Sequence, residues 1–429
     1  MTGPILVAET ADWHLGPMGG RIGEGGHNAR MLDLYRCARF VVEEARRRGA
    51  VCLLHAGDFS DTWRPTPTTV DFLRTIFRAA GEMPILGIDG NHDQAGSEIE
   101  MPATSLFEQE EARLTIVREP MVMGLFEGLG NDPSPRFVFK PIDDALPEGW
   151  ERLHLQIACV PWPNRQRLLA SEETQGRTPE QINLLIREKM MEIIHGLAVR
   201  VCETAKSTAP AVLLLHCTVD ESFSGGYSMM MTKDWRLNAH ELMELPFDYV
   251  ALGHIHKQQG WGRDPTDDSP ARMVAYCGSP EVVSFKEEGE AKGFYLVTVG
   301  GGEPTRYEFV ETPYRRFVTI DTTADEFTGL DQVVAQAKDA IVRLRLPATQ
   351  AGQARDLVQM LEKAGAHEVR VEIVRAETTR RREIDLGAGD MVEAGIDAWL
   401  AHHEEWKPRR DEMLVEAWRI EERRREAQA

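Results

Sequence analysis

The sequence predicts an α/β protein, and three observations support this fold class. Short apolar segments with the length of buried strands recur along the chain, at residues 5–8, 51–55, 84–88, 212–215 and 249–252. An amphipathic stretch at 29–48 separates the first two segments and has helical spacing. Each segment is followed by polar residues, and ligand sites of α/β sheets lie at the carboxyl ends of strands.

The rest of the chain divides by pattern. A helical pattern covers 180–205, whereas 120–150 is rich in Pro, Gly and Asp and is interpreted as an insertion without assigned function. After residue 311 strands and helices alternate without polar strand ends, which predicts a small separate α+β domain. Its predicted elements are strand 317–321, helix 329–340, strand 341–346, helix 353–364 and strand 369–374. A polar linker and two amphipathic segments follow.

The composition limits the kinds of partner. The chain has 429 residues, 42% of them hydrophobic, which is enough for two or three domains. Its formal net charge of -20 has the wrong sign for a protein that coats nucleic acid. A nucleic-acid site must therefore be local, and bound divalent cations can supply the positive field that it needs.

Cysteine usage and hydropathy indicate a cytoplasmic protein. The six cysteines are scattered without a CxxC pair or the density of a disulfide framework, which fits a reducing compartment. No stretch approaches the roughly 20 apolar residues that span a bilayer, and the first residues lack a signal-peptide pattern. We therefore expect a soluble protein of a bacterial or phage-infected cell, without a membrane partner.

The polar strand ends carry oxygen and imidazole donors that suit Mn, Fe or Zn. A carboxylate has two oxygens and can bridge two ions, which together clamp the attacking and leaving oxygens of a phosphoryl displacement. A single DxH tripeptide or histidine is more often a cap or packing residue, but the ordered set indicates a site. The set comprises Asp12, His14, Asp58, Asn91, His92, Asp93, His216, His254 and His256.

These motifs resemble those of the calcineurin-like metallophosphoesterases and, within them, the SbcD nucleases and their archaeal and eukaryotic counterparts, the Mre-eleven group. The resemblance is dense over 4–118 and 210–298 and weak between them. Four segments narrow it to the nuclease subfamily: DWHLG at 12–16, GDFSDTWRP at 57–65, YCGSPE at 276–281 and KGF at 292–294.

The resemblance implies a four-layer sandwich of two mixed sheets flanked by helices, with a small α+β capping domain and a C-terminal helical segment. The implied domains are a metallophosphoesterase (nuclease) domain at 1–311, a DNA-capping domain at 312–375, and a linker with a partner-binding helical segment at 376–429.

The resemblance also implies roles for the site residues. Asp58 would bridge two metal ions, and His92 would protonate the leaving 3′ oxygen. Asp93 would orient His92, with a turn cap as the equal alternative. Asp61 is assigned to the periphery, and His55 is interpreted as a core histidine. One ion would be held by Asp12, His14, Asp58 and His256, and the other by Asp58, Asn91, His216 and His254.

The activity implied by the family is Mn-dependent cleavage of DNA, 3′→5′ on duplex ends and endonucleolytic on single strands or hairpins, with Mg or Fe as other candidate metals. The C-terminal helices, with Trp399, Trp406 and Trp418, would bind an SMC-type ATPase of the SbcC kind, unless they pack on their own domain. A homodimer would form through the nuclease domain. Its candidate apolar residues are Val70, Leu73, Ile76, Phe77 and Leu106.

Two other functions stay open. The same metals would serve a phosphatase or small-substrate phosphodiesterase, although such an enzyme would need neither the capping nor the C-terminal region. A catalytically inactive scaffold would keep the fold, but such proteins usually lose ligands, and every position of this set holds a competent donor.

Overall fold

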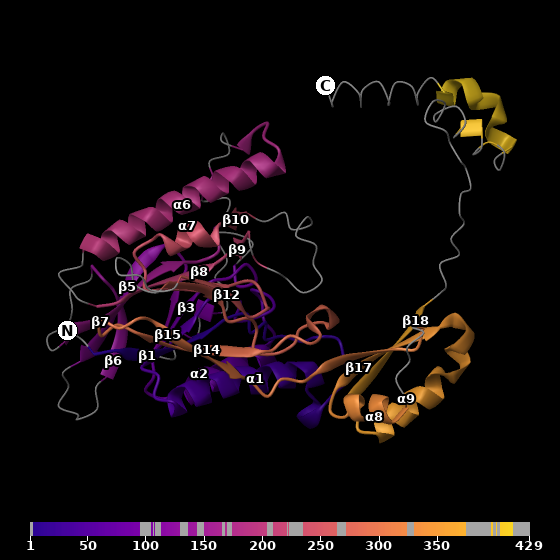
Figure 1. The fold of residues 1–429 in the computed structure, drawn as a ribbon, viewed down its shortest axis with the longest axis horizontal. Helices are drawn as coiled ribbons and strands as arrows, with labels where there is room; N and C mark the ends of the chain where they lie inside the picture. The colour runs from indigo at the N-terminus through magenta and orange to yellow at the C-terminus, as the bar shows by residue number, and fades with distance from the viewer. Residues whose placement is uncertain are drawn as a thin grey trace. The chain divides into compact units, whose positions relative to one another are not determined.

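A computed structural model describes most of the chain, and its contacts form two compact units, residues 1–374 and 375–429 (Figure 1). The predicted division at 311/312 and 375/376 stays a prediction. The described residues are 3–94, 104–105, 107, 113–128, 136–143, 150–164, 168–169, 174–203, 209–220, 222, 235–263, 272–323, 330–374, 396–397, 400 and 404–414.

The first sheet has six strands in the order β15-β14-β1-β2-β3-β4. Strands β1 to β4 run parallel, whereas β14 is antiparallel to β1, so the sheet is mixed. Its strands are β1 (Ile5–Thr10), β2 (Cys52–His55), β3 (Ile85–Ile88), β4 (Leu114–Val117), β14 (Gly293–Val299) and β15 (Arg306–Glu311).

The second sheet has seven strands in the order β12-β13-β11-β8-β7-β5-β6 and is also mixed. Its strands are β5 (Met121–Gly128), β6 (Arg136–Pro141), β7 (Trp150–Val160), β8 (Ala211–His216), β11 (Tyr249–Gly253), β12 (Gln259–Arg263) and β13 (Arg272–Tyr276). The segment 120–150 is thus not a simple insertion. It forms β5, which pairs with β7, and β6, which pairs with β5 and is the edge strand of the sheet.

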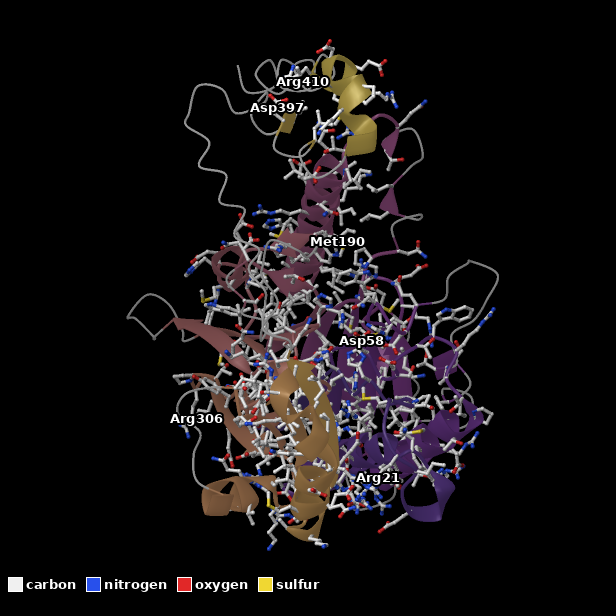
Figure 2. All side chains as sticks on the ribbon, turned by 90° about the vertical axis from the view of Figure 1, so that its right-hand side faces the viewer. Arg21, Asp58, Met190, Arg306, Asp397 and Arg410 are labelled. Carbon is white, nitrogen blue, oxygen red and sulfur yellow. The ribbon has the colours of Figure 1, made fainter. Side chains whose placement is uncertain are left out.

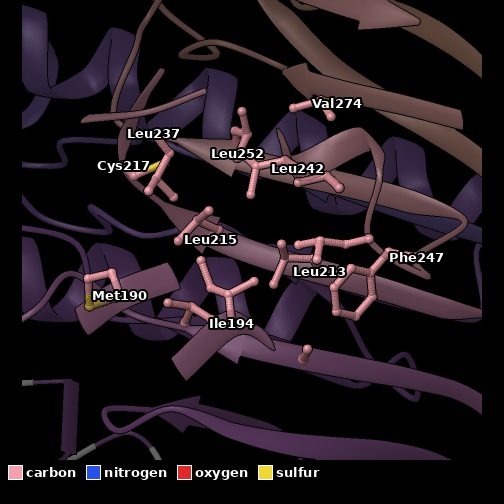
Figure 3. Close-up of a cluster of buried hydrophobic side chains, with 14 of the residues drawn as sticks. Met190, Ile194, Leu213, Leu215, Cys217, Leu237, Leu242, Phe247, Leu252 and Val274 are labelled. Carbon is pink, nitrogen blue, oxygen red and sulfur yellow. The ribbon is translucent and has the colours of Figure 1, made fainter. Parts of the chain in front are cut away.

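Helices cover the outer face of each sheet, which gives the predicted sandwich. Helices α1 (Ala29–Arg47) and α2 (Pro67–Ala79) pack on the first sheet, each begun by a side-chain cap, Asn28 or Thr66. Helices α6 (Pro179–Glu203) and α7 (Ala239–Met243) pack on the second sheet. Figure 3 shows Met190 and Ile194 of α6 against Leu213 and Leu215 of β8. A third apolar core lies between the two sheets. Shorter elements are η1 (Glu24–Gly26), β9 (Thr218–Val219), β10 (Arg236–Leu237) and η2 (Phe285–Glu287).

The apolar side of α2 belongs to the core of this chain. Leu73, Ile76 and Phe77 are buried against α1 and the first sheet. They are therefore unavailable for the dimer contact that the sequence suggested. The apolar side of this helix contacts the core of its own chain and not a second copy. Val70 is only partly buried, and Leu106 lies outside the described residues.

A third sheet follows β15. It has three parallel strands in the order β16-β17-β18, backed by helices. The alternation of strands and helices is the one that the sequence pattern predicted, whereas their parallel pairing was not predicted. Arg315 joins this sheet to α1 through two 2.8 Å bonds to Asp33. Its elements are β16 (Phe317–Asp321), α8 (Leu330–Ala337), β17 (Ile341–Pro347), η3 (Ala348–Gln353), α9 (Ala354–Lys363) and β18 (Glu368–Val374).

The described part of the second unit is short. It contains η4 (Glu404–Arg409), a following helical turn to residue 414, and an ion pair between Arg410 and Asp397. Trp399 and Trp418 and the side chain of Trp406 lie outside the described residues. None of the helices in the described part of the chain combines the length and apolar character needed to cross a bilayer.

Candidate metal centre

The seven residues predicted as metal ligands converge where the two sheets face each other. Each one lies at or just after the carboxyl end of a strand, on β1, β2, β3, β8 or β11. Asp12, His14 and His256 form one cluster of ligand atoms within 4.8 Å of one another, and Asp58, His216 and His254 form another. The Asn91 amide oxygen lies 3.0 Å from a ring nitrogen of both His216 and His254. Asp58, labelled in Figure 2, is 1% exposed.

Glycines explain how the loops approach so closely. A Cβ on Gly57 would lie 2.4 Å from His216 Nδ1, and one on Gly90 would lie 2.1 Å from the Asp58 carboxylate. A Cβ on Gly253 would lie 2.0 Å from the carbonyl oxygen of Ala56. Each of these three glycines directly precedes a predicted ligand, Asp58, Asn91 or His254. A side chain at any of them would prevent the loops from touching.

Four ligand residues adopt a backbone conformation that L-residues avoid. Asp12, His14, Asp58 and His254 have φ values of 52°, 43°, 60° and 101°. Each such residue costs roughly 1–2 kcal/mol, and strain of this kind gathers at functional sites. Backbone hydrogen bonds hold the conformation: Asp12 N–H donates to Gly57 O over 3.0 Å, and His14 N–H donates to Asp58 O over 3.1 Å.

The donor set fits divalent cations. The Nδ1 atom of His216 lies 2.6 Å from Ala56 O, and only an N–H can satisfy a carbonyl oxygen. Nε2 of His216 therefore carries a lone pair, and it faces Asn91 Oδ1 at 3.0 Å and Asp58 Oδ2 at 3.5 Å. Three acceptors facing one another call for a cation between them.

Burial shapes the protonation of the same residues. It lowers the pKa of His216 well below its usual value, which keeps the ring in the neutral form that binds metals. Burial also raises the pKa of Asp58, an effect that His14 opposes. A divalent cation would supply the positive charge that keeps this carboxylate ionised.

His92 lies beside the two clusters, in a third group of possible ligand atoms with His14 and Asp61. Its side chain is 39% exposed, and its ring packs edge-on to His14 with centroids 4.7 Å apart. Its Nδ1 lies 2.9 Å from the carbonyl oxygen of Asp61, so Nδ1 is the donor in this bond. Asp61 is thus more than peripheral, since its carboxylate also lies 3.6 Å from His14 Nδ1.

Asp93 does not orient His92 through any hydrogen bond of the described residues. Its buried carboxylate instead binds backbone amides of two loops, the role expected of the cap alternative. It thereby fastens the loop after β2 to the loop after β3. The donors are the N–H groups of Asp58 (2.7 Å), Gly90 (3.0 Å), Phe59 (3.1 Å) and Ser60 (3.3 Å).

Sequence reasoning assigned no role to two residues behind His256. Glu287 binds His256 Nδ1 at 3.0 Å, and Lys292 binds the His256 carbonyl oxygen at 2.9 Å. Burial alone would raise the pKa of Glu287, but its bonds to His256 and Lys292 lower that pKa to about 2. The only signal in the sequence was the Lys-Gly-Phe segment at 292–294, which carries no spacing typical of a metal site. His55 is a core histidine, as predicted, stacked on Phe59 at 3.6 Å.

Residues 5–258 match the family model of the calcineurin-like phosphoesterases. The chain belongs to this family. All seven predicted ligands of this calcineurin-like phosphoesterase lie inside the matched range. Its two mixed sheets flanked by helices are the fold expected from the motifs.

Two curated relatives of this phosphoesterase are the SbcD subunits of the nuclease SbcCD from Escherichia coli K12 and from Escherichia coli O157:H7. Each is 25% identical over 318 residues, covering 72% of this chain and 68% of the relative. The relation is distant, but the chain spans more than two thirds of both relatives.

Solved structures resemble the phosphoesterase only weakly. A 5′-nucleotidase precursor from Thermus thermophilus has a TM-score of 0.35 and 13% identity, covering 72% of this chain and 55% of that one. A dimetal phosphatase from Danio rerio has a TM-score of 0.37 and 10% identity, covering 71% and 98%. Likeness at this level says nothing about the substrate.

Proposed function

We propose that this phosphoesterase is a Mn-dependent DNA nuclease that hydrolyses phosphodiesters with two metal ions. It acts 3′→5′ on duplex DNA and endonucleolytically on single strands or hairpins. The observation that carries the proposal is the meeting of seven ligand residues with a solvent-accessible His92 at one edge of the sheets. The 25% identity to a nuclease subunit supports DNA over a small phosphoester.

The side chains divide the work of hydrolysis. Asp12, His14 and His256 would hold one ion, His216, His254 and Asn91 would hold the other, and Asp58, which lies 3.5 Å from both His14 and His216, would contribute to each. When bound, two divalent ions clamp the attacking and leaving oxygens and acidify a water molecule near neutral pH. His92 Nδ1–H donates to Asp61 O and orients the ring, and the imidazolium form would carry at Nε2 the proton for the leaving 3′ oxygen.

Assembly is also a proposal. An SMC-type ATPase of the SbcC kind binds the C-terminal helical segment, and two nuclease domains pair as a homodimer. The name of the curated relatives describes one subunit of a complex and supports a partner subunit, and the family resemblance implies that this partner is an ATPase. The net charge of -20 requires that DNA binds locally at the metal centre.

A cleavage assay tests the proposal. The purified chain is incubated with labelled duplex and single-stranded DNA in Mn, in Mg and in EDTA, beside His92→Ala and the exposed control His240→Ala. Degradation that requires metal and His92 but not His240 supports a nuclease, and the label position gives its polarity. Hydrolysis of bis(p-nitrophenyl) phosphate without DNA cleavage, even with the ATPase added, would favour the phosphatase. Absence of both metal and activity would favour the scaffold.

A further inference from the structure

The side chains behind His256 form a closed, buried group that has no part in the roles given above. We propose that Glu287 and Lys292 are positioning residues for His256. They make the metal position of Asp12, His14 and His256 the tighter of the two. This inference rests on the proposed two-metal function, and it concerns the order in which the positions bind metal.

Glu287 fixes the ring of His256. Its Oε1 lies 3.0 Å from His256 Nδ1, while Oε2 lies 2.8 Å from Lys292 Nζ and 3.0 Å from the N–H of Val283. A carboxylate accepts hydrogen bonds, so Nδ1 carries the proton and Nε2 carries the lone pair. That Nε2 lies 3.0 Å from His14 Nε2, across the space that a cation would fill. A carboxylate behind a ligand histidine also increases its basicity toward a metal.

Lys292 fixes the backbone of the same histidine. Its ammonium group is fully buried and donates to His256 O over 2.9 Å, with Glu290 Oε2 and Ser279 Oγ each 3.2 Å away. The His256 carbonyl accepts a second bond from the N–H of Ser279. A buried ammonium keeps its acceptors because leaving them unpaired is costly. His256 is thus held at both its ring and its main chain.

At the other metal position the described backing of His216 is neutral, because its Nδ1 faces the carbonyl oxygen of Ala56, and the amide of Asn91 takes the place of a carboxylate. Asp58 Oδ2 lies 3.5 Å from both His14 Nε2 and His216 Nε2, so neither Asp58 nor Asp93 behind it distinguishes the two positions.

The two positions therefore differ in charge. Among the described residues, the first position faces the Asp12 and Asp58 carboxylates, with Asp61 3.6 Å from His14. Glu287 behind His256 is paired with Lys292 and adds no net charge. The described carboxylate at the second position is that of Asp58. Because a cation is attracted in proportion to the facing negative charge, the first position binds more tightly and fills first.

A Mn²⁺ titration of the metal-free full chain tests this asymmetry by calorimetry. The wild type is expected to show two classes of site. Glu287→Gln, which is nearly isosteric, weakens the tighter class about 10- to 100-fold and leaves the weaker class unchanged. Lys292→Met acts in the same direction. His216→Ala disables the weaker position and identifies the class that remains.

The matched control is Glu281→Gln. Glu281 is also a buried carboxylate of this segment, but it binds Arg30 and the N–H of Arg315 and makes no described hydrogen bond to a metal ligand. We expect both classes to keep their affinity in this variant, whatever its thermal stability. If Lys292→Met fails to fold, Glu287→Gln alone decides the outcome.

The outcomes separate the inference from the function on which it rests. Two bound Mn²⁺ ions with equal affinity, or equal weakening of both classes by Glu287→Gln, would overturn the asymmetry and leave the two-metal centre in place. A wild-type chain that binds no Mn²⁺ would overturn the centre as well. Selective weakening of the tighter class supports the proposal.

Discussion

Parallel strands occur both at the metal centre and in the sheet of β16, β17 and β18, yet only the first region gathers ligand atoms among the described residues. Asp12 and Asp58 follow strands β1 and β2, and their positive φ values differ from ordinary strand geometry. The third sheet continues regularly past its strands, as in the bond from Thr322 N–H to Arg345 O. Parallel strands thus bring their carboxyl ends to one edge of a sheet. The strained turns that follow the strands then place the ligand side chains at that edge.

The charges of the two regions differ in the same way. In the third sheet Arg345 lies 2.6 Å from Asp321, and Arg370 lies 2.6 Å from Glu368, so each of these cations has an anion. At the metal centre acceptors face acceptors, as with His216 Nε2, which faces Asn91 Oδ1 and Asp58 Oδ2. The third sheet pairs these cations with anions and therefore needs no metal. The metal centre has lone pairs that face one another and therefore favours a bound cation.

The largest expected effect comes from a pair of aspartates with the same backbone conformation. Asp58 and Asp339, in the third-sheet region, both have φ 60°, a value that Asn tolerates. Asp58→Asn removes the bridging charge, so hydrolysis of bis(p-nitrophenyl) phosphate should fall to background and bound metal should be lost. Asp339→Asn should keep both. Equal activity of the two variants would break the comparison. Metal analysis and a colorimetric rate assay measure the outcome.

A smaller loss is expected from His92. His92→Gln should lower the rate by about 10²- to 10⁴-fold, because the proton for the leaving group is lost. Metal content should not change, since His92 is not among the predicted ligands. His367→Gln, in the third-sheet region, is the matched control and should keep full activity. Loss of metal in His92→Gln would show that this histidine is a ligand after all.

Two glycines with the same φ of +97° separate crowding from backbone strain. Gly365→Ala places a Cβ 3.6 Å from Lys338 Cγ, an ordinary contact, so only the strain of roughly 1–2 kcal/mol remains. Gly57→Ala collides with His216 and Gly90 and should cost more than about 4 kcal/mol. Urea unfolding of the metal-free variants measures both. Similar costs at the two positions would contradict close loop contact at the centre.

The smallest effect concerns Glu9, within β1 and three residues before Asp12. Burial raises the pKa of Glu9 to about 8, against a bond from Tyr249 that lowers it. The folded state therefore keeps its proton between pH 4.5, the ordinary value, and about 8. Stability should fall as pH rises through this window, by at most about 1.4 kcal/mol per unit, and level off above it. Unfolding at several pH values checks this.

Glu9→Gln is the variant for that measurement. It should remove this contribution to the slope and stabilise the protein at pH 8, because Gln carries no charge to desolvate. An unchanged slope in Glu9→Gln would show that the strand interior does not hold a neutral acid. The buried interior of β1 would then not differ from the loop after it, where the Asp12 carboxylate is a predicted metal ligand.

The sequence alone determined the α/β class, most elements and the set of candidate ligands. Apolar strands are visible in local composition, and Gly-Asp, Gly-Asn-His-Asp and Gly-His-Ile-His are local signals because glycine is needed where loops touch. The strands at 120–150 were not predicted because the pairing of β5 with β7, and of β6 with β5, outweighs the local Pro and Gly signals.

Tertiary structure alone decided how the side chains are used. Asp93 binds the amides of a loop more than thirty residues away, and Glu287 reaches His256 across a similar separation. The burial of Leu73, Ile76 and Phe77 likewise depends on which surface α2 covers. Local sequence does not specify such distant partners, because a hydrogen bond or an apolar contact depends on position in space.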